Sequence, residues 1–159
     1  AGERHFAPEA TCRSVDIQNR RRRHGQCTLL LFAFGEDSPT NPYIPHNLVR
    51  NCVAYTGTHD NNTTLGWFES LDEATRAKVY EYYGNPSEPM PWMLIHQAMA
   101  SPANTAVIPW QDFLGLDGSH RMNTPGTTQG NWRWRCPAEF LTDELADDLK
   151  ELTLRFGRG

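Results

Sequence analysis

Three short hydrophobic runs, at 29–34, 52–57 and 105–109, stand out along a chain that is otherwise mixed in polarity. The first run is apolar at every position, which is typical of a strand that is buried on both faces, as in a parallel sheet. The other two each include a threonine and end in a turn-forming residue, Gly57 or Pro109. The pattern therefore predicts three short strands, of which the first and the third are expected to be buried.

Helical signals lie between the second and third runs. Ser70 and Glu73 have the spacing of a capping box, with Ser70 as the N-cap, and predict a helix that ends near Tyr83. Pro91 suits the first turn of a further helix, over 91–100. Strands and helices that alternate in this way predict an α/β fold with a parallel sheet.

The last part of the chain is expected to be mostly loop followed by one helix. A short helical turn over 111–114 precedes a loop over 115–140 that is rich in Gly, Asn, Thr and Pro. Thr142 is placed to cap the final helix. The apolar stripe of that helix is Leu145, Leu149, Leu152 and Phe156.

The first 27 residues have no helical or strand periodicity and contain four consecutive arginines at 20–23. A basic patch for nucleic acid is one interpretation, and a disordered or foreign leader is the other. No aromatic residue interleaves with the arginines, which favours the leader. We expect a boundary between a leader over 1–27 and a folded part over 28–159.

Charge and composition narrow the class of protein. A formal net charge of −4 gives no reason to expect nucleic acid or an anionic membrane as a partner. No hydrophobic run reaches the roughly 18 residues of a transmembrane helix, and the N-terminus lacks the apolar core of a signal peptide. The cysteines show no CxxC spacing, so we expect free thiols in a reducing cytoplasm. We also expect no bound metal and no cofactor. They are Cys12, Cys27, Cys52 and Cys136.

The run 52–57 leads into a polar turn that carries His59 and Asp60 side by side. A carboxylate at the C-terminal tip of a strand can hold sugar hydroxyls or stabilise a cationic transition state. The alternative is that Asp60 caps its own turn by accepting from the amide of Asn62 or Thr63. His59 can likewise donate to a hydroxyl or be an ordinary loop histidine.

A second candidate segment, 121–135, combines amides, hydroxyls and two tryptophans. Tryptophan offers a flat apolar face to a sugar ring, and asparagine offers both a donor and an acceptor to hydroxyls. This makes Asn123, Asn131 and Trp132 candidates for substrate binding. The alternative is a loop fixed to the rest of the fold by Trp132 and Trp134.

Together these segments resemble a known family, the 4-α-glucanotransferases, also called amylomaltases or disproportionating enzymes. The resemblance is to the C-terminal part of the family and runs from about Thr28 to the end of the chain. It rests on an ordered set of blocks at 32–34, 41–47, 55–61, 64–67, 109–112, 121–126 and 130–135.

The resemblance implies a (β/α)₈ TIM barrel of which this chain has an incomplete, C-terminal portion, with about three parallel strands and their helices. It implies retaining transfer of α-1,4-glucan segments between maltooligosaccharides by two aspartates and a glutamate. Asp60 matches the aspartate that stabilises the distorted sugar, and His59 matches its neighbour on the same sugar. Phe32 matches an aromatic residue beside the substrate, and Asn123 matches a substrate-contacting asparagine.

The chain departs from the family pattern at the other two carboxylates. The family's nucleophile lies upstream of the matching segment, and its acid/base glutamate falls near Phe6, where only Glu3 is close and its surroundings do not match. Residues 1–27 resemble the family nowhere, which suggests a truncated gene, a frameshift or a mis-assigned start. We expect a fragment that is inactive alone. The alternative is a non-catalytic remnant that binds maltooligosaccharides.

Overall fold

A computed structural model describes residues 26–35 and 39–159, and its centre is a three-stranded parallel sheet in the order β1-β2-β3. The strands are β1 (Gln26–Leu29), β2 (Cys52–Tyr55) and β3 (Thr105–Val107). β1 pairs with β2 from Gln26↔Cys52 to Leu29↔Tyr55, and β2 pairs with β3 from Val53↔Thr105 to Tyr55↔Val107. The predicted α/β class and parallel sheet are confirmed.

The first hydrophobic run is a strand only at its beginning, so the predicted strand over 29–34 is wrong in its bounds. β1 ends at Leu29, and a 3-10 turn, η1 (Leu30–Phe32), follows. The amide of Ala33 closes that turn on the carbonyl of Leu30 at 3.0 Å. Leu30, Leu31 and Ala33 are buried, so the apolarity of these three positions reflects packing into the core. The boundary expected between residues 27 and 28 falls inside β1.

The third strand has the expected place in the chain but lies at an edge of the sheet. Thr105 and Val107 are exposed and Ala106 is half-buried. The prediction that this strand is buried is therefore wrong for the part of the chain that the structure describes. From the run 105–109, Ala106 and Ile108 pack against the hydrophobic clusters.

The capping box is not used, and an additional helix takes its place. α1 (Thr64–Ser70) is capped by the Thr63 hydroxyl, which accepts from the amide of Gly66 at 3.1 Å. Ser70 ends this helix by donating to the carbonyl of Trp67 at 2.6 Å. α2 (Glu73–Tyr82) is capped by Asp72, which accepts from the amide of Thr75 at 2.7 Å.

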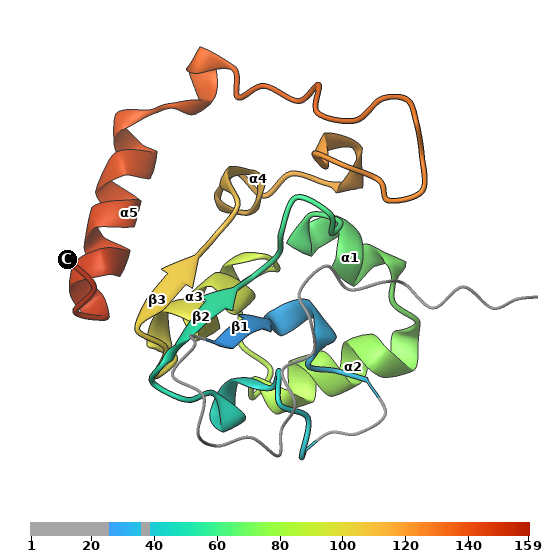
Figure 1. Cartoon of the computed structure of the whole chain (residues 1–159). Helices are drawn as coiled ribbons and strands as arrows, with labels where there is room; N and C mark the ends of the chain where they lie inside the picture. The colour runs from blue at the N-terminus through green and yellow to red at the C-terminus, as the bar shows by residue number, and fades with distance from the viewer. Residues whose placement is uncertain (1–25, 36–38) are drawn as a thin grey trace, which may run out of the picture.

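The remaining helices agree closely with the predicted positions. They are α3 (Trp92–Ala100), α4 (Trp110–Phe113) and α5 (Asp143–Arg155), and Thr142 caps α5 as predicted. Figure 1 shows α5 at the edge of the molecule, at the end of a long segment that passes over α4. Further 3-10 turns lie at η2 (Pro45–Asn47), η3 (Gly118–His120) and η4 (Ala138–Phe140).

Two hydrophobic clusters hold these elements together. The larger joins η1, β2, α1, α2 and α3 through side chains that include Leu30, Phe68, Val79 and Leu94. The smaller lies between α3 and α5 and contains Ile95, Met99 and Leu152. Burial of apolar surface at about 25 cal/mol per Å² makes such clusters the main source of stability. They fix β2, whose C-terminal end carries the polar turn.

Some sequence-based expectations concern residues that the structure does not describe. Glu3, Phe6, Cys12 and the arginines at 20–23 lie outside the described residues. Of the cysteines inside them, Cys27, Cys52 and Cys136 are free thiols. No helix in the described part is both long and apolar enough to cross a membrane.

Candidate functional site

The polar turn after β2 is closed by Asn61. Its side-chain oxygen accepts from the amide of Thr58 at 3.0 Å and from the hydroxyl of Thr58 at 2.7 Å, and its own amide donates to the Thr58 carbonyl at 3.1 Å. The amide of Thr63 donates to Asn62 Oδ1 at 3.0 Å. Asn61 and Asn62 therefore make hydrogen bonds within the turn, a role for which Asp60 was the candidate from the sequence.

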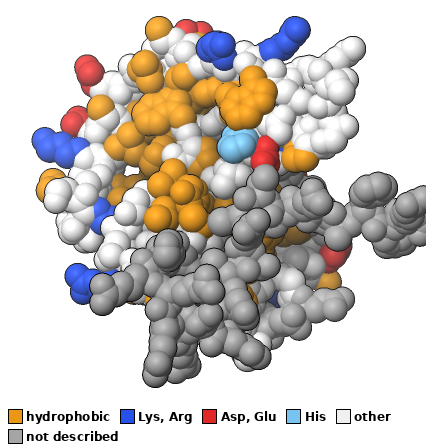
Figure 2. Space-filling view, in the orientation of Figure 1, with side chains coloured by type: hydrophobic (Ala, Val, Ile, Leu, Met, Phe, Trp, Pro, Cys, Tyr) orange, Lys and Arg blue, Asp and Glu red, His pale blue; other side chains and the backbone are white. Residues whose placement is uncertain are grey.

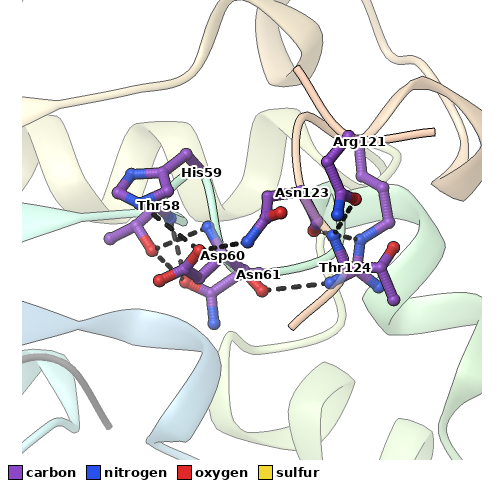
Figure 3. Close-up of polar contacts among 8 residues, drawn as sticks. Thr58, His59, Asp60, Asn61, Arg121, Asn123 and Thr124 are labelled. Carbon is purple, nitrogen blue, oxygen red and sulfur yellow. Dashed lines mark hydrogen bonds and ion pairs between the residues drawn. The ribbon is translucent and has the colours of Figure 1, made fainter. Parts of the chain in front are cut away.

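The Asp60 carboxylate instead meets a distant part of the chain. Asn123 Nδ2 donates to Asp60 Oδ1 at 2.7 Å, across 63 residues of sequence, as Figure 3 shows. Arg121 Nη2 donates to the backbone carbonyl of Asp60 at 3.0 Å, and Arg121 Nε donates to the carbonyl of Asn123 at 2.8 Å. Two predicted site residues, Asp60 and Asn123, are thus brought together.

His59 joins the carboxylate to an exposed indole ring. His59 Nε2 lies 3.3 Å from Asp60 Oδ1, and the His59 and Trp132 ring centroids are 5.0 Å apart. The Asp60 side chain is 25% exposed and that of His59 is 54% exposed, while Trp132 is 53% exposed. Solvent therefore reaches a carboxylate, an imidazole and a flat apolar face at one place.

Trp132 is held in this position by an unusual backbone conformation. Its φ of 61° lies in the left-handed region, which costs a non-glycine residue about 1–3 kcal/mol. The Trp132 amide donates to the carbonyl of Met122 at 2.7 Å. Asn131 Oδ1 accepts from the amide of Thr124 at 2.9 Å, and Asn131 Nδ2 donates to the carbonyl of Thr127 at 3.0 Å. Asn131 thus stabilises the loop, and its substrate contact stays a prediction.

An open hollow of about 600 Å³ adjoins the tryptophan. Figure 2 shows hydrophobic side chains gathered on the same side of the molecule as a histidine and an acidic side chain. Amides and hydroxyls dominate the hollow itself, which suits a hydroxyl-rich ligand. Its lining residues are Asn123, Thr127, Thr128, Gln129, Gly130, Asn131, Trp132 and Arg133.

Phe32 follows β1 at the same edge of the sheet at which the turn follows β2 (Figure 1). Its ring is 45% exposed and meets Tyr43 edge-on with centroids 5.7 Å apart. Asn41 Nδ2 donates to the Phe32 carbonyl at 2.8 Å. The structure thus places Phe32 at the carboxyl edge of the sheet and leaves its contact with substrate a prediction.

Sequence reasoning gave no role to Arg121 or to Asp112, although both lie in blocks that carry the family resemblance. Asp112 is 1% exposed and lies beneath the turn. It accepts from the Thr56 hydroxyl at 2.7 Å, the Thr64 amide at 2.8 Å and the Thr64 hydroxyl at 2.7 Å. Burial raises the pKa of the Asp112 carboxyl, and these three bonds oppose that rise.

Comparison with known proteins supports the same relationship. The profile of the family described as 4-alpha-glucanotransferase, glycoside hydrolase family 77, matches residues 13–142. The chloroplastic/amyloplastic 4-alpha-glucanotransferase of Oryza sativa subsp. japonica is 46% identical and covers 91% of this chain. The 4-alpha-glucanotransferase of Clostridium butyricum is 45% identical and covers 82% of this chain. Among solved structures, an amylomaltase from Streptococcus agalactiae in complex with acarbose covers 86%, with 35% identity and a TM-score of 0.82.

The matched part is a small share of each relative. It amounts to 25% of the rice protein, 27% of the Clostridium protein and 28% of the Streptococcus chain, so this chain spans about a quarter of their length. The family match begins at residue 13, so the expectation that residues 1–27 resemble the family nowhere is wrong for 13–27. With most of its residues matched by the family profile and relatives above 40% identity, the chain belongs to the 4-alpha-glucanotransferase family.

Proposed function

We propose that this chain is part of a 4-α-glucanotransferase that moves α-1,4-linked glucan segments between maltooligosaccharides with retention of configuration. Within it, Asp60 is the carboxylate that stabilises the distorted sugar at the cleavage point. The observation that carries the proposal is the 2.7 Å hydrogen bond from Asn123 to Asp60. The family resemblance assigns both residues to the substrate site, and this bond brings them together from separate segments of the chain.

The chemistry of the group suits that role. Retaining transfer passes through oxocarbenium-like transition states, and a carboxylate that binds ring hydroxyls through charged hydrogen bonds favours the flattened ring. His59 lies against the same carboxylate oxygen and supplies a further polar group for hydroxyls. Trp132, exposed beside His59, offers a face for a neighbouring sugar ring. The complex of the Streptococcus relative with acarbose supports this proposal.

Transfer also needs a nucleophile and an acid/base, which retaining enzymes hold about 5–5.5 Å apart. Neither has a motif match in residues 1–159. We infer that the chain forms the C-terminal portion of an incomplete (β/α)₈ barrel and does not catalyse transfer alone. Phe32 and Asn131 complete the proposed sugar contacts. Action in the cytoplasm stays a prediction, since the rice relative is named chloroplastic/amyloplastic.

A chimaera tests the catalytic proposal. Residues 28–159 replace the corresponding segment of the Clostridium butyricum relative, and glucose release from maltotriose is measured. We expect the chimaera to be active and Asp60→Asn to lower kcat by about 10²–10³, as for loss of one transition-state contact. Asp147→Asn, an exposed carboxylate on α5, is the matched control. Equal activity of the two variants would remove Asp60 from the mechanism.

The exposed Trp132 and the adjoining hollow favour a second, simpler function, which is non-catalytic binding of maltooligosaccharides. Titration of the purified chain with maltoheptaose, followed by tryptophan fluorescence, tests it. Asn123→Ala should weaken binding about tenfold, the expected effect of removing a hydrogen bond to a charged group. Glucose release from maltotriose by the purified chain would contradict the inference that it is inactive alone.

A further inference from the structure

Asp112 is a buried carboxylate that the proposed sugar contacts do not use. We propose that it is a positioning residue for the transfer reaction, which holds both ends of the loop 57–63 and so fixes His59 and Asp60. This inference rests on the proposed function, because it concerns the place of that site's carboxylate. At 1% exposure Asp112 does not touch a ligand and acts only through the residues that it binds.

The two ends of the loop meet on this one carboxylate. Thr56 is the first residue after β2, and Thr64 is the first residue of α1. The hydroxyls of both donate to Asp112 Oδ2 at 2.7 Å, and the Thr64 amide donates to Oδ1 at 2.8 Å. All three donors are buried with the carboxylate, so none of these bonds can be replaced by water without opening the core.

The loop between those ends has little room to move separately. A methyl group added at Gly57 would already lie 3.6 Å from Leu31 Cδ1, and Asn61 closes the turn on Thr58. The Asn62 side chain lies between α1 and η3, where a methyl group on Gly66 or Gly118 would approach Asn62 Oδ1 to within 2.8 Å. A shift at either end of the loop is therefore passed on to His59 and Asp60.

Gln111, the residue beside Asp112, fixes the segment that leads into Arg121 and Asn123. Gln111 is buried, and its Nε2 donates to the carbonyl of His120 at 3.2 Å. His120 directly precedes Arg121, which binds the Asp60 backbone and the Asn123 carbonyl. The short helix α4 therefore sets both the turn and the loop, and Asp112 is its contact with the turn.

Hydrogen bonds to an ionised group are roughly twice as strong as neutral ones, and a buried donor that loses its partner is costly. Asp112→Ala strands three donors at once and endangers the fold itself. Thr56→Val is a better test, because it keeps the shape of the side chain and removes one bond at one end of the loop. Thr56→Ser restores that hydroxyl. Thr28→Val is the control, since Thr28 is buried on the neighbouring strand β1.

The full chain is titrated with maltoheptaose, and NMR follows the ring signals of His59 and Trp132. We expect Thr56→Val to weaken binding about tenfold and to move both ring signals. Thr56→Ser and Thr28→Val should stay close to the parent in both measurements. A folded Thr56→Val chain with parental affinity and parental ring signals would overturn the positioning role.

Failure of the proposed function is recognised separately. If the parent chain binds no maltoheptaose, the sugar site itself is wrong. The ring signals then decide the positioning role alone: movement in Thr56→Val but not in Thr28→Val supports it. Unchanged signals in Thr56→Val, or equal movement in Thr28→Val, contradict it.

Discussion

Tyr83 has a buried hydroxyl with no hydrogen-bond partner among the described residues. Burial, and secondarily the adjacent Tyr82, raise the pKa of this phenol far above its ordinary value. An unpaired buried hydroxyl costs stability, so we expect Tyr83→Phe to increase the free energy of unfolding by roughly 1 kcal/mol. Urea denaturation of both proteins measures the difference.

Tyr82→Phe is the matched control for that change. The Tyr82 hydroxyl lies 2.9 Å from His46 Nδ1, so its removal loses a hydrogen bond. We expect this variant to be unchanged or less stable, by up to about 1 kcal/mol. A loss of stability in Tyr83→Phe equal to that in Tyr82→Phe would mean that the Tyr83 hydroxyl has a partner.

The sequence was enough to predict that the polar residues of the turn 57–63 belong to a functional site. It was not enough to assign the turn-closing hydrogen bonds and the sugar contact to particular residues. The sequence allowed Asp60 to be either a turn cap or a sugar carboxylate. Asn61 makes the turn bonds, and the Asp60 carboxylate accepts a hydrogen bond from Asn123, 63 residues away. A contact over that distance depends on the folding of the whole loop 121–132, which local spacing cannot encode.

At the scale of elements, the contact between α1 and η3 depends on the absence of a side chain at Gly66. A methyl group there would lie 2.6 Å from the Gly118 amide nitrogen and 2.8 Å from Asn62 Oδ1. Alanine favours helix by up to about 1 kcal/mol, but backbone overlap outweighs that gain. We expect Gly66→Ala to lower the free energy of unfolding by about 1–3 kcal/mol, measured by denaturation.

Gly35→Ala supplies the control, because Gly35 is exposed and no atom of the described residues lies within 4 Å of its added methyl group. It should leave stability unchanged within roughly 0.5 kcal/mol. The same loss of stability in both variants would show that α1 and η3 can separate without cost. Because η3 leads into Arg121, Gly66→Ala should also weaken maltoheptaose binding.

Asp112, which joins α4 to the turn and to α1, makes the stability of the folded chain depend on pH. Its pKa is higher in the folded chain than its ordinary value of 3.8, with burial as the main cause. As pH rises, the unfolded chain therefore loses this proton first, and the carboxyl's contribution to stability decreases until the folded pKa is passed. Asp112→Asn does not titrate, and its amide can donate to both threonine hydroxyls.

We therefore expect the stability of Asp112→Asn relative to the parent to increase as pH rises from below the ordinary pKa of 3.8 toward the raised pKa of the folded chain. Thermal unfolding of both proteins across this range measures it. The comparison cancels the contributions of Asp72 and Asp117, two exposed carboxylates whose pKa values are lowered by local hydrogen bonds. A difference that stays constant with pH would show that Asp112 titrates alike in both states.

Element positions were easier to predict than their ends, for a physical reason. Ser70 and Glu73 fit a capping box, but the Ser70 hydroxyl donates to the end of α1 and Asp72 caps α2 instead. A carboxylate two residues later competes for the same role, and the sequence motif does not weigh the two. α1 itself was missed because it is short and Gly66 lowers its helix propensity.

At the scale of the whole molecule, the three-stranded sheet leaves β3 as an edge strand. Within the described residues β3 pairs with β2 alone, so its outer backbone groups face no strand there. Val107, at the end of β3, is 41% exposed. Unpaired, partly apolar edges favour association with another chain.

We therefore expect the purified chain to self-associate through β3 as its concentration rises, with sedimentation velocity as the measurement. A lysine on an edge strand opposes edge-to-edge pairing, so Val107→Lys should shift the chain toward monomer. Val49→Lys adds the same charge at a residue that is 51% exposed and lies outside the strands. If Val49→Lys restores the monomer as well as Val107→Lys does, net charge and not the β3 edge controls association.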